Sequence, residues 1–186
     1  ALISYRTAYL KKYYPVEFYA ATISSSVGNP DKLAFYLEAA RKEGIEILYP
    51  NINTSQESFA VVEEKNKQGE KRKVIRVGLS GIKNVGGEAV KAIISNRPYE
   101  DYQDFVNKVD LSKVKKRVCH SLISVGCFNE LGINRASLLD AYMNVQKIGG
   151  KEKQMTLFGG VANEVKYSDL PPMSLREKLK VEEELL

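Results

Sequence analysis

The chain has 186 residues, 44% of them hydrophobic, which is enough for one large or two small domains with a sizeable core. A formal net charge of +5 weakly favours a polyanionic partner. The spacing of Cys119, His120 and Cys127 fits neither a disulfide framework nor a metal site, so these residues are interpreted as structural and the chain as intracellular. No apolar run reaches transmembrane length and no signal peptide is evident, so no membrane partner is expected. Both ends are typical of a piece of a longer protein.

The first 44 residues are predicted to form three helices. Apolar residues recur at helical spacing over residues 2–14, and Pro15 then opens a second helix that continues to residue 25. Asn29 is predicted to cap a third helix, which ends at Gly44. The tyrosines of the first helix are interpreted as a packing surface, although an aromatic and basic face could also lie against nucleic acid.

Short β-branched runs predict strands after these helices. One run covers residues 45–48, and two longer ones cover residues 58–62 and 74–79. The last two flank a very polar tract, residues 63–73, that contains an Asn-Lys-Gln-Gly turn sequence. We therefore expect a β-hairpin with a mobile, charged tip.

The chain is organised around residues 79–94, LSGIKNVGGEAVKAII. Apolar residues lead into Lys83-Asn84-Val85-Gly86, and a new apolar register at helical spacing follows, which is the pattern of a helix-hairpin-helix. Asn84 and Gly86 suit a turn that needs positive φ or a bare backbone, and Val85 can fill the gap between the helices. Gly86 and Gly87 leave the N–H groups of the second helix uncovered for a phosphate. An ordinary helical hairpin with a glycine turn is the alternative.

A degenerate second copy of this motif is predicted downstream. After a break at residues 96–99 and a short apolar stripe at 102–109, helices are expected over residues 111–125 and 134–147, with a Gly126-Cys127-Phe128 turn between them. The first half of the 111–125 helix carries a basic cluster, which consists of Lys113, Lys115, Lys116 and Arg117.

From residue 148 the composition is that of a flexible linker. An island of larger residues, Gln154-Met155-Thr156-Leu157-Phe158, lies in this linker and cannot form a core by itself. Such an island is often a peptide ligand for a groove on another protein, although it could also fold back on its own domain. A last helix is expected from Ser174, with Glu177 completing a capping box.

These stretches together resemble the alpha subunits of bacterial DNA polymerase III, the C-family of replicative polymerases. Residues 1–11 and 14–18 are similar to the family's fingers region, residues 82–86 and 122–128 to its tandem helix-hairpin-helix, and residues 154–158 to its internal sliding-clamp motif.

The resemblance implies a mainly α fold with a small β-hairpin. The end of the fingers would cover residues 1–50. A duplex-binding domain would cover residues 51–147, with its hairpin at about 57–79 and its tandem motif at about 79–147. A flexible segment with the clamp motif would follow at 148–173, and residues 174–186 would begin a helix that leads to a missing OB-fold.

The resemblance also implies a role in replication. The family adds deoxynucleotides to a primer end, using Mg²⁺ ions that paired carboxylates of its palm hold. This chain lacks that pair, because Asp101 and Asp104 have no flanking strand, so alone it is expected to be inactive and to hold no cofactor. We expect it to act in the bacterial cytoplasm on double-stranded DNA, the sliding clamp and, through the parent protein, other replisome subunits.

Each site has expected contacts. Duplex phosphates would bind the backbone around Asn84, Val85, Gly86 and Gly87, with charge from Lys83, Lys91 and Arg97 and a less specific contribution from the basic cluster. In the clamp motif, Leu157 and Phe158 would be anchors, Gln154 would fix the register, and Met155 and Thr156 would be spacers.

Two other classes stay open. One is a stand-alone helix-hairpin-helix module of DNA repair or recombination. The other is a protein-interaction fragment whose hairpins are purely structural. A salt titration of duplex binding would separate both DNA-binding classes from the structural one.

Overall fold

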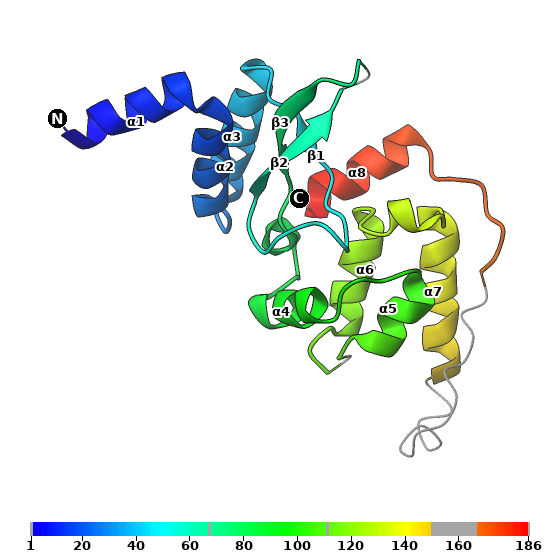
Figure 1. The fold of residues 1–186 in the computed structure, drawn as a ribbon. Coiled ribbons are helices and arrows are strands. Elements are labelled where there is room, and N and C mark those ends of the chain that lie inside the picture. The colour runs from blue at the N-terminus through cyan, green and yellow to red at the C-terminus, as the bar shows by residue number, and fades with distance from the viewer. Residues whose placement is uncertain (1, 67, 111, 150–166, 186) are drawn as a thin grey trace. The chain divides into compact units, whose positions relative to one another are not determined.

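The computed structural model describes residues 2–66, 68–110, 112–149 and 167–185, and this part of the chain is mainly helical with one three-stranded sheet, as the sequence predicts (Figure 1). None of its helices is long and apolar enough to cross a membrane. In chain order the elements are α1 (Leu2–Tyr13), α2 (Pro15–Ser25), α3 (Pro30–Lys42), β1 (Ile47–Leu48), β2 (Ala60–Lys65), β3 (Lys71–Arg76), η1 (Leu79–Gly81), α4 (Gly87–Ser95), α5 (Tyr102–Lys108), α6 (Lys116–Ser124), η2 (Asn129–Leu131), α7 (Arg135–Gly149) and α8 (Leu175–Leu185).

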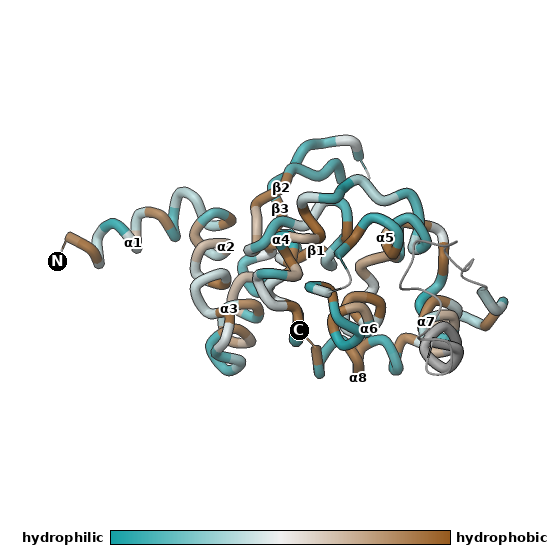
Figure 2. Tube along the Cα trace, turned by 90° about the horizontal axis from the view of Figure 1, so that it is seen from below, coloured by the Kyte–Doolittle hydropathy of each residue, from teal (hydrophilic) through white to brown (hydrophobic). Residues whose placement is uncertain are grey.

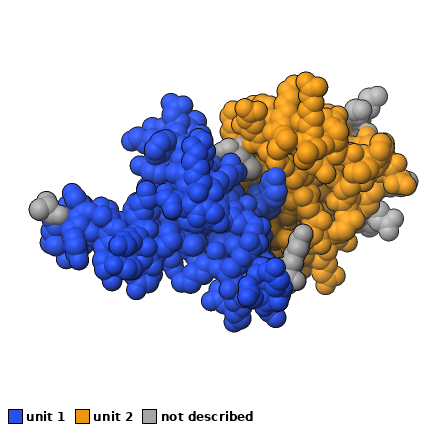
Figure 3. Space-filling view, turned by 90° about the horizontal axis from the view of Figure 1, so that it is seen from above, with its two compact units in different colours: residues 1–50, 54–81 blue, residues 51–53, 82–186 orange. Residues whose placement is uncertain are grey.

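The chain divides into two compact units, which Figure 3 colours separately. Unit 1 comprises residues 1–50 and 54–81, and unit 2 comprises residues 51–53 and 82–186. The β-hairpin therefore belongs with the N-terminal helices, whereas helices α4 to α8 belong to unit 2.

The helix ends in unit 1 follow the predicted signals. Pro15 occupies the first turn of α2, where its missing N–H is not needed. Asn29 caps α3, because its side-chain oxygen accepts the N–H of Lys32 at 3.1 Å. After α3, Gly44 has a φ of 77°, and its N–H donates to the carbonyl of Arg41 at 3.0 Å, which ends the helix.

The predicted β-hairpin is confirmed, but its strands reach further into the polar tract than expected. β2 and β3 pair antiparallel, with Glu63 opposite Lys73 and Glu64 opposite Arg72, so residues assigned to the tip form rungs of the ladder. Opposite charges across the strands favour this pairing. Asn66 then closes a short turn, since its side-chain oxygen accepts the N–H groups of two later tip residues at 2.9 Å. β1 adds to the other edge of β3 in parallel.

Helix α1 buries none of its described side chains. Tyr5, Tyr9 and Tyr13 follow one another along it, with successive ring centroids 6.3 and 4.6 Å apart. Figure 2 marks the apolar residues that recur along this helix. Among the described residues, these tyrosines therefore pack on one another and not into a core, and that they form a packing surface stays a prediction.

An aromatic cluster lies at the centre of unit 2. Ring centroids 5.0–5.9 Å apart join Tyr99, Tyr102, Phe105 and Phe128, all of which are buried. The Tyr99 hydroxyl donates to the carbonyl of Ile93 at 2.7 Å and so ties the cluster to α4. Residues 51–53 join this unit because the N–H of Ile52 donates to the carbonyl of Cys127 at 2.9 Å. Burial of several aromatic side chains supplies much of the apolar contact in this unit.

The helix predicted over residues 111–125 is shorter in the structure. α6 begins at Lys116, because the residues before it form a turn that starts at Asp110. Lys113 and Lys115 therefore precede the helix and do not lie within it.

The later helices are close to their expected bounds. α7 spans Arg135–Gly149, two residues beyond the predicted end at 147. α8 begins with the predicted capping box, in which the Glu177 carboxylate accepts the N–H of Ser174 at 2.8 Å and the Ser174 hydroxyl accepts the N–H of Glu177 at 3.3 Å.

Candidate nucleic-acid interface

The first hairpin, residues 83–86, is a tight turn that leads into α4. Asn84 has a φ of 72°, as predicted for the turn. Val85 is buried, and its N–H donates to the carbonyl of Ile82 at 3.1 Å. The helix expected before the hairpin is only η1, a single 3-10 turn, because the apolar residues ahead of it belong to β3 and the chain that continues from it.

Gly86 leaves the start of α4 open to solvent. It caps the helix with a φ of −83° and a ψ of 162°, and no side chain accepts a hydrogen bond there. The first N–H groups of a helix have no partner within the helix. A Cβ placed on Gly86 would meet no described atom within 4 Å, so the space above it is open. An anion such as a phosphate can therefore approach the backbone at this point.

A second hairpin, residues 112–115, repeats the first at an offset of 29 residues, since α4 spans 87–95 and α6 spans 116–124. Lys115 takes the place of Gly86, with a φ of −68°, a ψ of 165° and again no side-chain cap. The N–H of Cys119 donates to the carbonyl of Lys115 at 3.2 Å, as that of Val90 donates to Gly86 at 3.0 Å. The repeat thus pairs this hairpin with the first, whereas the sequence analysis placed the second turn after α6.

The second hairpin carries the predicted basic cluster. Val114 is buried in the position that Val85 takes in the first hairpin. The cationic side chains around it are all exposed, namely Lys113, Lys115, Lys116 and Arg117. The first turn of α6 contains no acidic residue, whereas that of α4 contains Glu88. Positive charge therefore gathers at the N-terminus of α6, where the helix dipole adds to its attraction for anions.

Asp110 shapes the second hairpin, a role that the sequence analysis missed. Its carboxylate accepts the N–H of Ser112 at 2.9 Å and the Ser112 hydroxyl at 2.6 Å. Its main-chain carbonyl accepts the N–H of Val114 at 2.9 Å. The Ser112 hydrogen bonds, with the nearby charge of Lys113, hold the pKa of Asp110 below its usual range. The Asp-x-Ser spacing is the sequence signal for such a turn.

The first hairpin is joined by a side-chain hydrogen bond to α6, the helix that follows the second hairpin. The Asn84 amide donates to the hydroxyl of Ser121 on α6 at 3.1 Å, and Ser121 is buried. Asparagine at this turn therefore supplies both the left-handed conformation and a link to the second hairpin's helix.

The three single cations predicted to add charge differ in their surroundings. Lys83 and Lys91 are exposed. Arg97 is half-buried, and its Nε donates to the carbonyl of Ile52 at 2.7 Å. Part of the donor capacity of Arg97 is thus used to hold residues 51–53 in unit 2.

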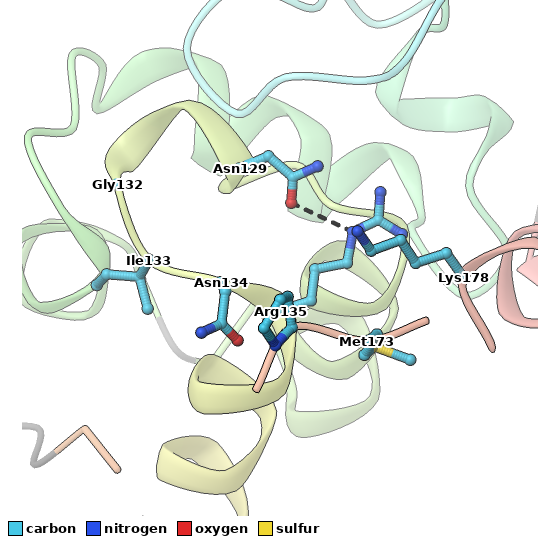
Figure 4. Close-up of a pocket in the computed structure, with 8 residues that line it drawn as sticks. Asn129, Gly132, Ile133, Asn134, Arg135, Met173 and Lys178 are labelled. Atoms are coloured by element: carbon cyan, nitrogen blue, oxygen red, sulfur yellow. Dashed lines mark hydrogen bonds between the residues drawn. The ribbon is translucent and has the colours of Figure 1, made fainter. Parts of the chain in front are cut away.

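The glycine turn after α6 receives a side chain from α7. Gly126 has a φ of 83°, and a Cβ there would lie 2.4 Å from Nη2 of Arg135. A pocket of about 320 Å³ lies beside this arginine. Its lining residues are drawn in Figure 4 and include Asn129, Ile133, Asn134, Met173 and Lys178. Arg135 itself donates to Asn129 at 3.2 Å. Because the guanidinium is already bonded, we assign this pocket no ligand.

Among the described residues, no group of three or more His, Cys, Asp or Glu side chains could hold a metal ion. Asp101 caps α5 by accepting the N–H of Asp104 at 2.7 Å. Lys108 donates to Asp104 at 2.7 Å and holds the pKa of Asp104 below its usual range. Cys119 and Cys127 are buried free thiols, and burial raises the pKa of Cys119 to about 11. The hydrogen bonds of the two aspartates and the burial of the two cysteines are those of residues that stabilise the local fold.

The predicted clamp motif, residues 154–158, lies outside the described residues. The chain after it is attached to α7. The Ser168 hydroxyl donates to the Asp140 carboxylate at 2.7 Å, and the Asn134 amide donates to the carbonyl of Leu170 at 3.0 Å.

Comparison with known proteins matches this arrangement. A family model described as a helix-hairpin-helix motif matches residues 44–138, which include both hairpins. The DNA polymerase III subunit alpha of Helicobacter pylori is 37% identical over 177 residues, 89% of this chain and 15% of the relative. That of Campylobacter jejuni is 35% identical over 200 residues, and that of Borreliella burgdorferi is 34% identical over 202 residues. Both alignments cover all of this chain and 16% and 17% of the relative.

The chain spans about a sixth of the length of the curated relatives that it matches. The predicted resemblance to the bacterial DNA polymerase III alpha subunit is confirmed, and the chain belongs to the helix-hairpin-helix family.

Proposed function

We propose that this chain is the part of a bacterial replicative DNA polymerase that holds duplex DNA behind the active site and tethers the enzyme to its sliding clamp. The observation that carries the DNA contact is the pair of hairpins, each leading into a helix whose N-terminus has no side-chain cap. Two such helix starts on one compact unit can each bind a backbone phosphate.

The two hairpins would recognise phosphates in different ways. The first was predicted to offer backbone N–H groups around Asn84, Val85, Gly86 and Gly87, with charge from Lys83 and Lys91. We keep Asn84, Gly86 and Gly87 as the proposed donors and leave out the N–H of Val85, because it already donates to the carbonyl of Ile82. The second offers the exposed cations of the basic cluster. Neither set reads base edges, so binding would be independent of sequence. We leave Arg97 out of the proposed contact, because its side chain is bonded within unit 2.

Polymerase chemistry would belong to other parts of the parent protein. Its palm would hold the Mg²⁺ ions that activate the primer 3′-hydroxyl and stabilise the leaving pyrophosphate. This chain alone would then bind no cofactor and incorporate no nucleotide. Other replisome subunits would meet it through the parent, in the bacterial cytoplasm.

A salt titration tests the DNA contact. Two labelled duplexes of unrelated sequence are titrated with the chain at several salt concentrations, and anisotropy gives the dissociation constants. We expect equal affinities and a log–log slope that steepens by about 0.9 for each neutralised phosphate. A strong preference for one duplex, or no binding at low salt, would contradict the proposal.

The clamp contact is proposed for Gln154-Met155-Thr156-Leu157-Phe158. Burial of Leu157 and Phe158 in an apolar groove would contribute roughly 1.5–3 kcal/mol each. A hydrogen bond from the Gln154 amide would add about 1 kcal/mol. Ordering a short peptide costs entropy, so the isolated contact would be modest. In the parent, bound DNA would raise the effective concentration of the motif near the clamp.

Binding of the chain to a purified bacterial clamp tests this part. We expect Leu157→Ala/Phe158→Ala to remove measurable binding, whereas the matched control Met155→Ala/Thr156→Ala keeps it, because the two spacers would face partly away from the groove. Duplex affinity should be the same in both variants. Clamp binding that is absent from the wild type, or equal in wild type and the anchor variant, would refute the tether.

A further inference from the structure

The first hairpin is held by a helix that lies about a hundred residues further along the chain. The N–H of Lys83 donates to the carbonyl of Leu185, at the end of α8, at 2.8 Å. A backbone N–H and a backbone carbonyl that bond to each other tie their two segments together. The two groups therefore satisfy each other, and the end of α8 fixes the start of the hairpin.

α8 is in turn locked in place by an ion pair. Arg135 on α7 donates to the carboxylate of Glu182 on α8 at 2.6 Å, and the two side chains are only 6% and 10% exposed. The same nitrogen of Arg135 donates to the carbonyl of Ser124 at 3.2 Å, at the end of α6. Gly126 makes room for this guanidinium, as its close approach to Arg135 shows.

A buried pair of this kind is sensitive to the loss of either member. Removing one partner leaves the other charge buried without compensation, which destabilises the contact strongly. Glu182 lies three residues before Leu185, so one turn of α8 carries both the ion pair and the carbonyl that meets Lys83. Loosening the pair therefore loosens the hairpin.

The second hairpin has separate supports. Tyr142 on α7 donates through its hydroxyl to the carbonyl of Lys116 at 2.5 Å, in the first turn of α6. Asp110 closes the turn itself. Neither of these two hydrogen bonds involves α8, although α8 also packs against the body of α6.

We propose that Arg135 and Glu182 are positioning residues for DNA binding, which act by holding α8 against the first hairpin. The second hairpin depends on them less, because its turn is closed by Asp110 and its first helical turn is held by Tyr142. This inference rests on the proposed binding of duplex DNA. Neither residue would touch the phosphate. Their role is to keep the N–H groups at Gly86 and Gly87 in the orientation that a phosphate needs.

A double-mutant cycle tests the inference. Glu182→Gln removes the charge and keeps the shape, and it is combined with Gly86→Val at the first hairpin or with Lys115→Gln/Lys116→Gln at the second. We expect Glu182→Gln and Gly86→Val together to weaken duplex binding no more than the stronger of the two does alone. The losses from Glu182→Gln and the second-hairpin variant should multiply, within about twofold. A general loss of structure would not produce this pattern.

Amide hydrogen exchange gives a second readout that does not need DNA. In the wild type the N–H of Lys83 should be protected, and Glu182→Gln should speed its exchange, whereas the N–H of Cys119 in α6 should keep its protection. Two results would overturn the positioning role and leave the proposed DNA binding intact. One is independent effects of Glu182→Gln and Gly86→Val on duplex affinity, and the other is fast exchange of the Lys83 N–H in the wild type. Loss of all duplex binding by the wild type would instead overturn the proposed function, and this inference with it.

Discussion

The two hairpins have nearly the same backbone conformation but differ in the side chains and charges that they present. Each ends in an extended residue that opens a nine-residue helix, with a buried valine directly before it. In the first hairpin that extended residue is Gly86, and in the second it is Lys115. Because Lys115 adopts nearly the same dihedral angles, the backbone itself does not require glycine at this point. We infer that glycine at this position leaves the backbone N–H groups open to a ligand such as a phosphate, and is not needed for the fold of the turn.

The difference extends to the charges around each hairpin. Glu88 lies in the first turn of α4 and opposes a phosphate by its charge, so a phosphate there would depend on hydrogen bonds from the backbone at close range. The second hairpin presents exposed cations, whose attraction reaches about a Debye length of 10 Å at moderate salt. We infer that the two hairpins contribute differently to DNA binding. The first would contact a phosphate at close range, and the second would attract the duplex over a longer distance.

Of the changes that test this difference between the hairpins, removal of the basic cluster should alter duplex binding most. The variant Lys113→Gln, Lys115→Gln, Lys116→Gln and Arg117→Gln removes the charge and keeps the hairpin backbone. We expect the log–log salt slope of duplex binding to become shallower by up to about 3 to 4, at about 0.9 for each lost phosphate contact. Anisotropy titrations at several salt concentrations measure this slope.

A variant with the same change in net charge controls for a general electrostatic effect. This control variant removes four exposed cations from unit 1 by the substitutions Lys11→Gln, Lys12→Gln, Arg41→Gln and Lys42→Gln. We expect a clearly smaller change in slope from this control. Equal changes would mean that net charge, and not the second hairpin, supplies the attraction.

Local signals in the sequence predicted much of this interface. Asn84 was predicted to take positive φ and does so, and the capping box at Ser174 and Glu177 forms as expected. The second hairpin escaped prediction because Lys115 and Lys116 stand where the first hairpin has Gly86 and Gly87, and because residues 111–125 keep an apolar period that is typical of one continuous helix. The sequence signals of the repeat are few. At the offset of 29 residues, Val85, Ile94 and Ser95 correspond to the identical residues Val114, Ile123 and Ser124.

Contacts between distant residues were beyond what the sequence alone could predict. The Asn84–Ser121 hydrogen bond joins residues 37 positions apart, and the Arg135–Glu182 pair joins residues 47 positions apart. No periodicity within a helix indicates which helix will lie opposite. Burial of Ser121, Arg135 and Glu182 then makes their pairing specific, because a polar group without a partner is costly away from water.

Substitution of Gly86 should have an intermediate effect and separates bulk from charge. Gly86→Val places a side chain where the phosphate would approach, and we expect it to lower duplex affinity and to remove about 0.9 from the salt slope. The fold should tolerate it, because a Cβ meets open space, although valine is a poor helix cap and costs about 1 kcal/mol. Titrations and urea unfolding measure both effects.

Gly86→Lys is the matched partner of that variant, because it gives the first hairpin the residue that the second one has. If close backbone contact matters there, lysine should recover the salt slope and only part of the affinity. Unchanged affinity in Gly86→Val, with folding confirmed by the unfolding curve, would leave the first hairpin with a purely structural role.

Acid should loosen the second hairpin and spare the first, which is the smallest of the expected effects. Asp110 holds the second turn with a carboxylate whose pKa lies below its usual range, chiefly because of the Ser112 hydrogen bonds. A carboxyl with a lowered folded pKa stabilises fully above its ordinary value of about 3.9, and that contribution is lost as the pH falls through the folded value. At the same offset of 29 residues, the first hairpin has Gly81 in place of Asp110.

Amide exchange, corrected for the intrinsic rate at each pH, measures this difference within one molecule. We expect the opening free energy at Val114, whose N–H is bonded to the carbonyl of Asp110, to fall below about pH 4. The value at Val85, whose N–H is bonded to Ile82, should fall less. In Asp110→Asn the difference should vanish, because an amide oxygen accepts the same hydrogen bonds and does not titrate in this range. Parallel loss at both valines in the wild type would mean that acid acts on the whole unit, and that the carboxylate does not distinguish the two hairpins.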